Sequence, residues 1–447
     1  MLKSSKIWVY AFGCRSNLYE SEALAGELIS RGASITDNVD GCDVALIVSC
    51  SVTAVADKKC RQAVRKARRE FDSRRKFGIV AVCGCWAQGL DASEAQKMGI
   101  DILVGNRLKH LLPDSLEKTA ASLSASGGKN FIDLRRNVME RFWDSLSLER
   151  PLLRTRAFLK IQEGCDHFCS YCVIPYLRGR STSRQLEDVL TEARRIVEHG
   201  CREIVLTGTH LGMYGRDNSS HDGGLAELVG KLSGIPGLTR LRLGSLEPFT
   251  LDAELLSALA ESQIFCRHLH LPMQSGDDAV LARMKRGHKA DDFVRVCDLA
   301  REALSDDLHI SSDVMVAFPG EDGAAFENTL KMMDKVRLGR VHVFPYSPRK
   351  GTVAEKFPNR IPHKTASERV KSAITLGESL LERYSSRFVG QNLSVLIEES
   401  DGEGSFTGYA RNFISAAVRS SSEIKSGTEI NAHMTEYSGG KLRGAIS

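Results

Sequence analysis

The feature that most constrains the fold is a regular alternation of short apolar segments with amphipathic helical segments. Within residues 1–110 the apolar segments have strand length, and they lie at 6–12, 43–49, 78–83 and, more weakly, 100–104. Helical patterns near 18–31 and 54–72 separate them. This alternation is typical of a parallel sheet with crossover helices. We therefore predict an N-terminal parallel α/β domain over residues 1–115.

A second alternation of the same kind begins near residue 154. Its six strand patterns lie at 156–162, 203–208, 239–244, 267–272, 310–317 and 341–345. A complete eight-unit barrel usually takes about 250 residues, so six units in a shorter span predict a partial (β/α)6 barrel. We place this domain at residues 151–388. The preceding interval, 116–150, contains a stretch of small polar residues and is predicted to be a linker.

The last part of the chain changes character after a helical stretch near 364–387. Residues 389–447 contain short alternating segments that are separated by glycines. This pattern is typical of a small β-barrel or β-sandwich, and we predict a β-barrel.

Composition excludes several classes of protein. With 42% hydrophobic and 26% charged residues, the chain is not broadly disordered. No uninterrupted apolar run approaches the roughly 18 residues of a membrane helix, so we expect no membrane association and a cytoplasmic location. Twelve cysteines are too few for a disulfide scaffold in 447 residues, and they favour metal or redox chemistry.

The strongest motif is Cys165-x3-Cys169-x2-Cys172, which directly follows the first strand of the predicted barrel. Active sites of such barrels lie at the C-terminal ends of the strands. Clustered thiolates favour iron–sulfur centres or zinc. Three cysteines would leave one iron of a [4Fe–4S] cluster open for a substrate. A zinc knuckle or buried thiols are the alternative, and the position at the barrel mouth favours the cluster.

A second set of cysteines is dispersed along the chain. Cys14, Cys50 and Cys85 each follow one of the first three long apolar segments. Because parallel sheets bind ligands at the carboxyl ends of their strands, these thiols could converge on a second cluster. The spacing fits buried packing residues equally well. Cys83 competes with Cys85 for the third position.

Together these motifs resemble the radical S-adenosylmethionine methylthiotransferases over nearly the whole chain. The segments AFGCRSNLYESE, VSCSVT and GCWAQ resemble the cluster-binding domain of that family, and the last of them favours Cys85 over Cys83. The central part is similar to the radical-SAM barrel, and the tail is similar to the RNA-binding TRAM domain.

The resemblance implies two [4Fe–4S] clusters and S-adenosylmethionine as cofactors. It assigns the catalytic cluster to Cys165, Cys169 and Cys172. Reduction of that cluster would cleave S-adenosylmethionine and generate a 5′-deoxyadenosyl radical. The resemblance assigns a second cluster, implied in sulfur delivery, to Cys14, Cys50 and Cys85.

Within the family, the segments around Cys165, RHLHLPMQSGDDAVLARMKRGH and VHVFPYSPRKGT resemble the MtaB branch most closely. That branch adds a methylthio group at C2 of N6-threonylcarbamoyladenosine, beside the tRNA anticodon. The alternatives are action on N6-isopentenyladenosine, action on a ribosomal-protein aspartate, and a non-catalytic iron–sulfur protein. We expect a monomer that needs tRNA and a low-potential electron donor.

Polar residues near the predicted strand ends are candidate contacts for S-adenosylmethionine. They are Thr207, Gly208, Ser245, Glu247, Gln274 and Asp313. Glycine lets a backbone approach a ligand closely, and the polar groups can orient it. Each of these residues is equally typical of a turn or a helix cap.

Residues 58–76 hold 10 basic and 2 acidic side chains, a local charge of +8 against +5 for the whole chain. Val64, Ala67 and Phe71 form an apolar stripe at helical spacing. A solvated helix face is the ordinary interpretation of such a run. Its single sign and its position after Cys50 favour tRNA contact through Arg65, Arg68 and Arg69.

Overall fold

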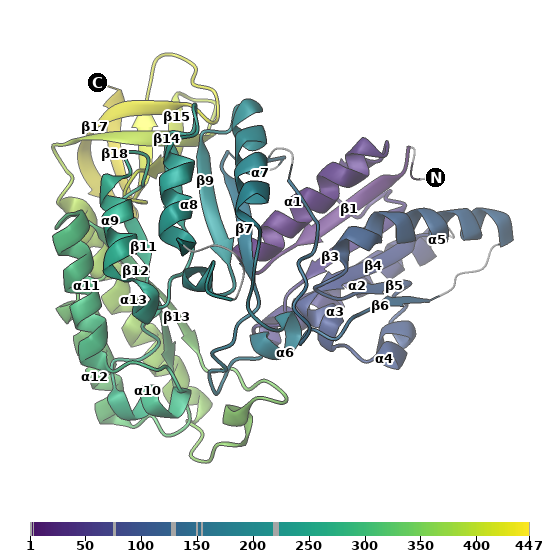
Figure 1. Ribbon diagram of the computed structural model, residues 1–447, viewed down its shortest axis with the longest axis horizontal. Helices are drawn as coiled ribbons and strands as arrows, with labels where there is room; N and C mark the ends of the chain where they lie inside the picture. Colours follow the sequence, from purple (N-terminus) through teal and green to yellow (C-terminus); the bar gives the residue numbers. More distant parts are fainter. Residues whose placement is uncertain are drawn as a thin grey trace.

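The computed structural model describes residues 2, 4–74, 77–126, 131–148, 151–152, 155–217 and 223–446. These residues form an N-terminal sheet, a central curved sheet and a C-terminal barrel (Figure 1). Parallel α/β packing and a small closed barrel confirm the predicted fold class. No helix in the described ranges combines the length and the hydropathy of a membrane span.

The N-terminal sheet is entirely parallel, with the strand order β2-β1-β3-β4-β5-β6. The strands are β1 (Lys6–Ala11), β2 (Ser34–Thr36), β3 (Val44–Ser49), β4 (Ile79–Gly84), β5 (Ile102–Val104) and β6 (Ile132–Leu134). The helices are α1 (Arg15–Ser30), α2 (Ala54–Ser73), α3 (Cys85–Gly89), α4 (Ala92–Lys97) and α5 (Leu112–Ser126). Every residue of β3 and β4 is buried, which explains why both segments are continuously apolar.

Part of the predicted linker belongs to this sheet instead. Helix α5 continues to Ser126, and β6 pairs with β5 at the sheet edge. Leu116 of α5 is fully buried in the core of this domain. The small residues near 120 suit a helix as well as a loop, and a strand of three residues is too short to show a period. Residues 127–130 and 149–150 of the predicted linker lie outside the described residues.

The central sheet carries six parallel strands in chain order, as the sequence predicts. They are β7 (Ala157–Glu163), β9 (Glu203–Gly208), β10 (Arg240–Leu243), β11 (His268–His270), β12 (His309–Val316) and β13 (Arg340–Pro345). The short antiparallel β8 (Thr182–Ser183) pairs with β7. Two isolated β-bridges, Leu241 with Phe265 and Ser245 with His270, join the half that contains β7, β9 and β10 to the half that contains β11, β12 and β13.

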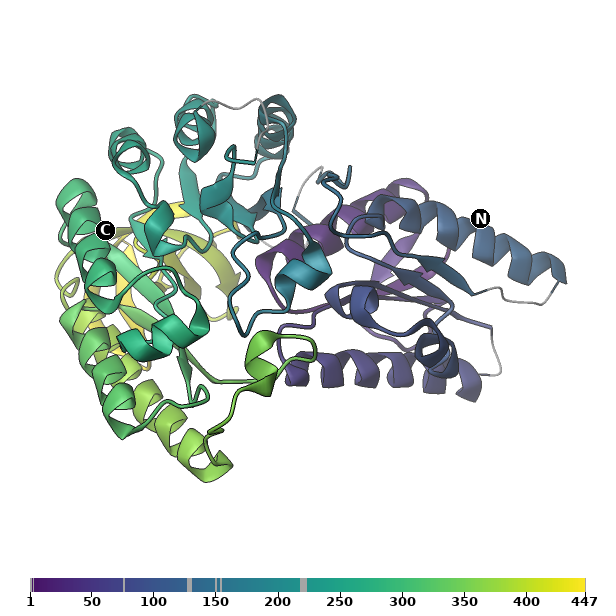
Figure 2. The ribbon, with the colours of Figure 1, turned by 60° about the horizontal axis from the view of Figure 1, so that its bottom comes forward.

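The helices of this domain are α6 (Ile174–Arg178), α7 (Leu186–Glu198), α8 (Gly224–Ser233), α9 (Ala253–Glu261), α10 (Asp278–Met284), α11 (Ala290–Leu304), α12 (Gly323–Lys335) and α13 (His363–Ser386). Helices α7, α8, α9, α11, α12 and α13 cover the outer side of this curved sheet, whereas α6 lies beside α3 of the N-terminal domain (Figure 2). The largest hydrophobic core lies between the outer helices and the strands. The arrangement is the predicted partial barrel.

The C-terminal domain is a closed barrel of five strands in the order β14-β15-β16-β18-β17. The strands are β14 (Asn392–Ser400), β15 (Ser405–Ala410), β16 (Ser415–Arg419), β17 (Glu429–Ser438) and β18 (Lys441–Ile446). Buried and less buried residues alternate along β15, as expected for a strand with one face on the core.

Buried arginines attach the central sheet to this barrel. Arg240 lies 2.8 Å from Glu429, and Arg242 donates hydrogen bonds to the carbonyl of Ala410. Both arginines also contact Glu203 in β9, at 2.6 Å and 2.8 Å. Burial favours the neutral form of Glu203, but Arg242, Arg240 and Arg156 outweigh it and lower its pKa to about 2. Glu203 is therefore ionised and central to this interdomain contact.

We expect Glu203→Gln to lower the free energy of unfolding by about 3 kcal/mol at neutral pH, because it removes one partner of a buried ionic network. Since the folded-state pKa lies below the ordinary value of 4.5, this stabilisation is present above pH 4.5 and declines toward pH 2. The free energies of unfolding of wild type and variant, measured by urea titration, should therefore converge as the pH falls through this window. The exposed Glu187→Gln serves as control, and a constant difference across the window would contradict the assignment.

Candidate functional site

The first cysteine loop begins directly after β7. Gly164 has a φ of +77°, and a Cβ atom there would lie 2.1 Å from the carbonyl oxygen of Arg180. Only glycine fits this position without displacing the backbone. The N–H of Cys165 then donates to the carbonyl of Gly179 at 2.9 Å. The loop therefore closes on itself and holds its cysteines at the C-terminal end of the strand.

The three cysteines of this loop are partly exposed. Cys172 N–H donates to the Cys169 carbonyl at 3.0 Å, and Phe168 between the cysteines has a φ of +49°. A bulky residue with positive φ is uncommon and marks a constrained turn. In the part of the chain that the structure describes, no three His, Cys, Asp or Glu side chains are placed to bind a single metal ion. A [4Fe–4S] cluster fits this loop, since each thiolate binds a different iron.

The electrostatics distinguish Cys169 from its neighbour Cys165. Burial raises the pKa of Cys165 to about 12. Burial acts in the same direction on Cys169, but a hydrogen bond from His167 and the charge of Arg286 outweigh it and lower the pKa. Arg286 lies 3.6 Å from the Cys169 sulfur. Cys169 is therefore the thiol most readily ionised, and the thiolate is the form that binds metal.

Two predicted cofactor contacts, Thr207 and Gly208, lie at the end of β9. Thr207 is buried, and a Cβ on Gly208 would lie 2.9 Å from the Gln162 side chain. Beyond them, His210 places its Nδ1 atom 3.5 Å from the Cys165 sulfur. The buried Nε2 atom of His210 finds no hydrogen-bond partner among the described residues. Sequence reasoning missed His210, although it follows the predicted contacts directly.

The other predicted contacts have different surroundings. The Glu247 carboxylate accepts a hydrogen bond from Arg286 at 3.1 Å. Ser245 is exposed. Gln274 has a φ of +63°, and its buried Oε1 atom has no partner within the described ranges. Because an unpaired buried acceptor is costly, this oxygen suits a ligand donor such as the amino group of S-adenosylmethionine. Asp313 lies inside β12 rather than at its end, 3.4 Å from His270.

The second set of cysteines lies at the carboxyl edge of three adjacent strands. Cys14 precedes α1, Cys50 follows β3 and Cys85 begins α3. Gly13 has a φ of +107°, and a Cβ there would lie 2.7 Å from Cys50 Cβ and 2.9 Å from its sulfur. The loop before Cys14 therefore packs directly on Cys50.

Arg178 connects two of these sulfur atoms. Its Nε atom donates to Cys85 at 3.1 Å, and its Nη2 atom lies 3.9 Å from the Cys14 sulfur. Cys83, two residues earlier, belongs instead to the hydrophobic core, and burial raises its pKa to about 12. The geometry thus favours Cys85, as the motif resemblance does, and the donor set of three thiols near a guanidinium suits an anionic cluster.

A buried ionic network joins the two cysteine sites. Arg178 lies 2.8 Å from Glu163, which precedes the Cys165 loop. Lys160 lies 2.7 Å from both Glu163 and Glu20, and Lys109 lies 3.2 Å from Glu20. All five side chains are buried. Sequence reasoning missed this network, although charged residues within the apolar strand β7 were a signal that could have revealed it.

The predicted RNA-binding residues on α2 separate into two groups. Val64, Ala67 and Phe71 are buried as expected. Arg65 and Arg69 are exposed. Arg68 turns inward, hydrogen-bonds to Gly99 and lies 2.5 Å from Asp101. Arg68 is thus partly buried and paired with Asp101, because its helix position lies next to the buried stripe, and its contact with RNA stays a prediction. Residues 75 and 76 of the basic run lie outside the described residues.

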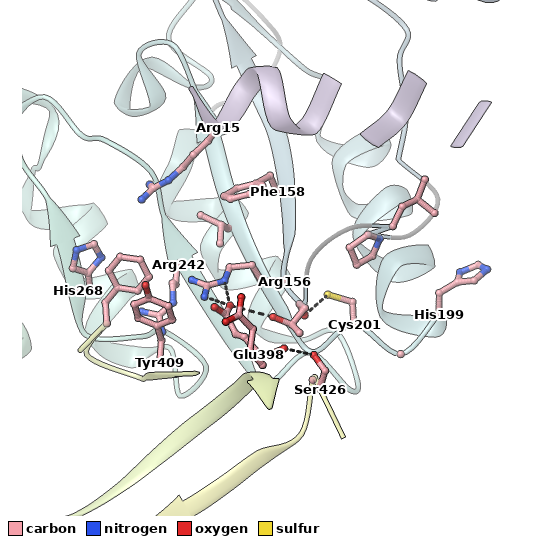
Figure 3. Close-up of a pocket in the computed structure, with 18 of the residues that line it drawn as sticks. Arg15, Arg156, Phe158, His199, Cys201, Arg242, His268, Glu398, Tyr409 and Ser426 are labelled. Atoms are coloured by element: carbon pink, nitrogen blue, oxygen red, sulfur yellow. Dashed lines mark hydrogen bonds and ion pairs between the residues drawn. The ribbon is translucent and has the colours of Figure 1, made fainter. Parts of the chain in front are cut away.

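A cavity of about 880 Å³ lies at the N-terminal ends of the central strands, between them and the C-terminal barrel (Figure 3). All three domains contribute to its lining. The charged and aromatic residues there include Arg15, Arg156, Arg242, Glu398, Glu399, Phe158, Tyr409 and Phe413. Burial holds the pKa of nearby His268 well below its ordinary value. Cavities of this volume accommodate small-molecule or nucleoside ligands.

Two family descriptions match the chain. Residues 159–333 match the Radical SAM superfamily, and residues 6–105 match the family described as "Uncharacterized protein family UPF0004". The first match contains the Cys165 loop, and the second contains Cys14, Cys50 and Cys85.

Curated relatives match over most of the chain. The threonylcarbamoyladenosine tRNA methylthiotransferase MtaB of Bacillus subtilis is 33% identical over 93% of this chain and 90% of its own. The MtaB of Thermotoga maritima is 35% identical over 91% and 89%. The tRNA-2-methylthio-N(6)-dimethylallyladenosine synthase of Agrobacterium fabrum is 31% identical over 89% and 87%.

Among solved structures, the radical S-adenosylmethionine methyltransferase TsrM from Kitasatospora setae has a TM-score of 0.53 and 15% identity, with 77% of each chain covered. That likeness supports the fold alone. The sequence relatives cover at least 89% of this chain and at least 87% of their own lengths. This chain therefore belongs to the radical S-adenosylmethionine methylthiotransferases, which use S-adenosylmethionine and two [4Fe–4S] clusters as cofactors.

Proposed function

We propose that this chain adds a methylthio group at C2 of N6-threonylcarbamoyladenosine next to the anticodon of tRNA. The observation that carries the proposal is a cation-lined cavity between the central strands and the C-terminal barrel, which Arg15 of the N-terminal domain enters. Arg15, which directly follows Cys14, lines that cavity together with Arg156 and Arg242. The names of the Bacillus and Thermotoga relatives support the same substrate.

The chemistry of the two candidate nucleosides separates them. The threonylcarbamoyl substituent carries a carboxylate, a hydroxyl and two N–H groups, whereas the isopentenyl substituent is a hydrocarbon. An apolar substituent would desolvate Arg15 in this cavity without replacing its lost hydrogen bonds to water. A site built for polar groups discriminates strongly against an analogue that lacks them. The cavity therefore favours the threonylcarbamoyl nucleoside over the isopentenyl nucleoside.

The proposed roles of the cysteines follow from their surroundings. Cys165, Cys169 and Cys172 would hold the cluster that binds S-adenosylmethionine, and Cys14, Cys50 and Cys85 would hold the second cluster. When bound, these groups supply the one-electron chemistry and the sulfur that an unactivated C2–H bond requires. Arg286 and Arg178 stabilise negative charge on their neighbouring thiolates. The buried network beneath both loops excludes water and fixes their orientation.

Nucleoside mass spectrometry tests the substrate directly. In a strain that lacks the gene, we expect the 2-methylthio derivative of N6-threonylcarbamoyladenosine to disappear from tRNA while its precursor accumulates. A plasmid copy of the wild-type gene should restore it, and a Cys169→Ala copy should not. Loss of the methylthio-isopentenyl nucleoside instead would move the function to that substrate. Unchanged tRNA with an altered ribosomal-protein aspartate would select the remaining alternative.

Replacement of Cys85 tests the second cluster site. Two [4Fe–4S] clusters contain about eight iron atoms, so Cys85→Ala should reduce anaerobically reconstituted iron to about four per chain. Cys83→Ala is the matched control, because that thiol lies in the apolar core, and it should retain about eight. Iron and sulfide assays measure both values. Equal iron loss in the two variants would show that Cys85 is not specifically a ligand.

Charge reversal on α2 tests the tRNA surface. Arg65→Glu combined with Arg69→Glu should weaken tRNA binding about tenfold at low salt and reduce its salt dependence, because fewer phosphate counterions are released. Filter binding at several salt concentrations measures both effects. Arg295→Glu with Lys335→Glu makes the same change in net charge at exposed positions on α11 and α12. If both double variants weaken binding equally, α2 has no particular role.

Three expectations from the sequence concern the reductant, the oligomeric state and the cellular location. A low-potential electron donor, a monomeric state and a cytoplasmic location stay predictions.

A further inference from the structure

Arg15 belongs to the N-terminal domain, but its side chain lies in the cavity of the central domain. It is the first residue of α1 and directly follows Cys14. Figure 3 shows its side chain extending from α1 into the space in front of the central strands, on the side where Arg242 and His268 lie. One residue therefore connects the proposed sulfur-delivery site to the substrate cavity.

The other two arginines of the cavity already have partners. Arg156 contacts Glu398 at 3.0 Å and Glu203 at 3.6 Å, and its guanidinium lies 4.9 Å from the centre of the Tyr409 ring. Arg242 lies 2.8 Å from Glu203 and 4.9 Å from the centre of the Phe413 ring. These contacts attach the floor of the cavity to the C-terminal barrel, so both cations are structural.

Arg15 differs from them. Its guanidinium makes no hydrogen bond or ion pair with any residue that the structure describes. Arg156 and Arg242 repel its charge, and Asp313 attracts it. Asp313 is in turn close to His270, at 3.4 Å, and is also influenced by His342. A partly exposed guanidinium that faces two like charges is stabilised when an anion binds it, and it can exchange its water for that anion.

We propose that Arg15 determines substrate specificity by binding the carboxylate of the N6-threonylcarbamoyl group. This inference rests on the proposed function and names the part of the substrate that Arg15 recognises. In adenine, C2 and C6 are both bonded to N1, so a substituent on N6 lies on the same edge of the base as C2. A residue adjacent to Cys14 can therefore reach the substituent while C2 faces the sulfur-delivery site. Arginine matches a carboxylate with two parallel hydrogen bonds.

A binding experiment with the reconstituted holoenzyme tests this role. The probes are two fluorescent anticodon stem-loop RNAs that differ only at the target base, N6-threonylcarbamoyladenosine or adenosine. Wild type should bind the modified RNA more tightly. Arg15→Gln should reduce that preference about 10- to 100-fold, since a hydrogen bond to a charged group contributes about 1.5–3 kcal/mol. Affinity for the adenosine RNA should not change, and Arg15→Lys should retain part of the preference.

A change in the substrate provides a second measurement that does not depend on the variant. The second probe is a stem-loop whose threonyl carboxylate is a methyl ester. Its affinity for wild type should be as low as the affinity of the unesterified RNA for Arg15→Gln. Arg15→Gln should not distinguish acid from ester, which completes a double-mutant cycle. Arg295→Gln, exposed on α11, is the matched control and should behave as wild type. Iron content and S-adenosylmethionine affinity should be unchanged in Arg15→Gln.

Two results would overturn the inference. If wild type prefers the acid over the ester and Arg15→Gln keeps that preference, another residue binds the carboxylate while the proposed function stands. If Arg15→Gln loses affinity for S-adenosylmethionine but not for the carboxylate, Arg15 belongs to the cofactor site. Failure of the proposed function is recognised separately, because wild-type enzyme would then form no methylthio-threonylcarbamoyl nucleoside.

Discussion

The structure depends on a buried ionic network between the N-terminal and central domains. Glu20 and Lys109 come from one side, and Lys160, Glu163 and Arg178 from the other. Burial alone would raise the pKa of Glu163, but Arg178, Lys160 and Lys109 hold it well below its usual range. Removing a partner from such a network leaves an uncompensated buried charge, which costs several kcal/mol. The two domains therefore dock in the one orientation that pairs these groups.

This orientation determines how the two cysteine sites face each other. Arg178 contacts Cys85 on one side and Glu163 on the other, and Glu163 lies two residues before Cys165. The same docking carries Arg15 from the Cys14 loop into the central cavity. A second network around Glu203 attaches the C-terminal barrel at the opposite ends of the strands. The cavity is thus enclosed by three domains, and ionic contacts rather than linkers set its shape.

Prediction from sequence succeeded where the signal was local. Long apolar strands such as β3 and β4 were located within a few residues, because full burial requires largely apolar sequence. Short edge strands such as β6 were missed, since three residues show no period. The ion pair between Arg68 and Asp101 was not predicted, because the charge of a residue does not reveal whether its side chain meets a carboxylate from another segment. Asp313 was grouped with the strand-end residues, although the predicted segment 310–317 and β12 both place it in the middle of the strand.

The sequence by itself determined the three regions of secondary structure, the two cysteine sets and the family to which they belong, because hydrophobic period and motif spacing are local properties. Only the tertiary structure decided which charged residues meet. Lys160 and Glu20 are 140 residues apart, and Arg178 and Cys85 are 93 apart. Such pairs leave no trace in local periodicity. They form because desolvated charges require partners, and only the docked domains bring those partners together.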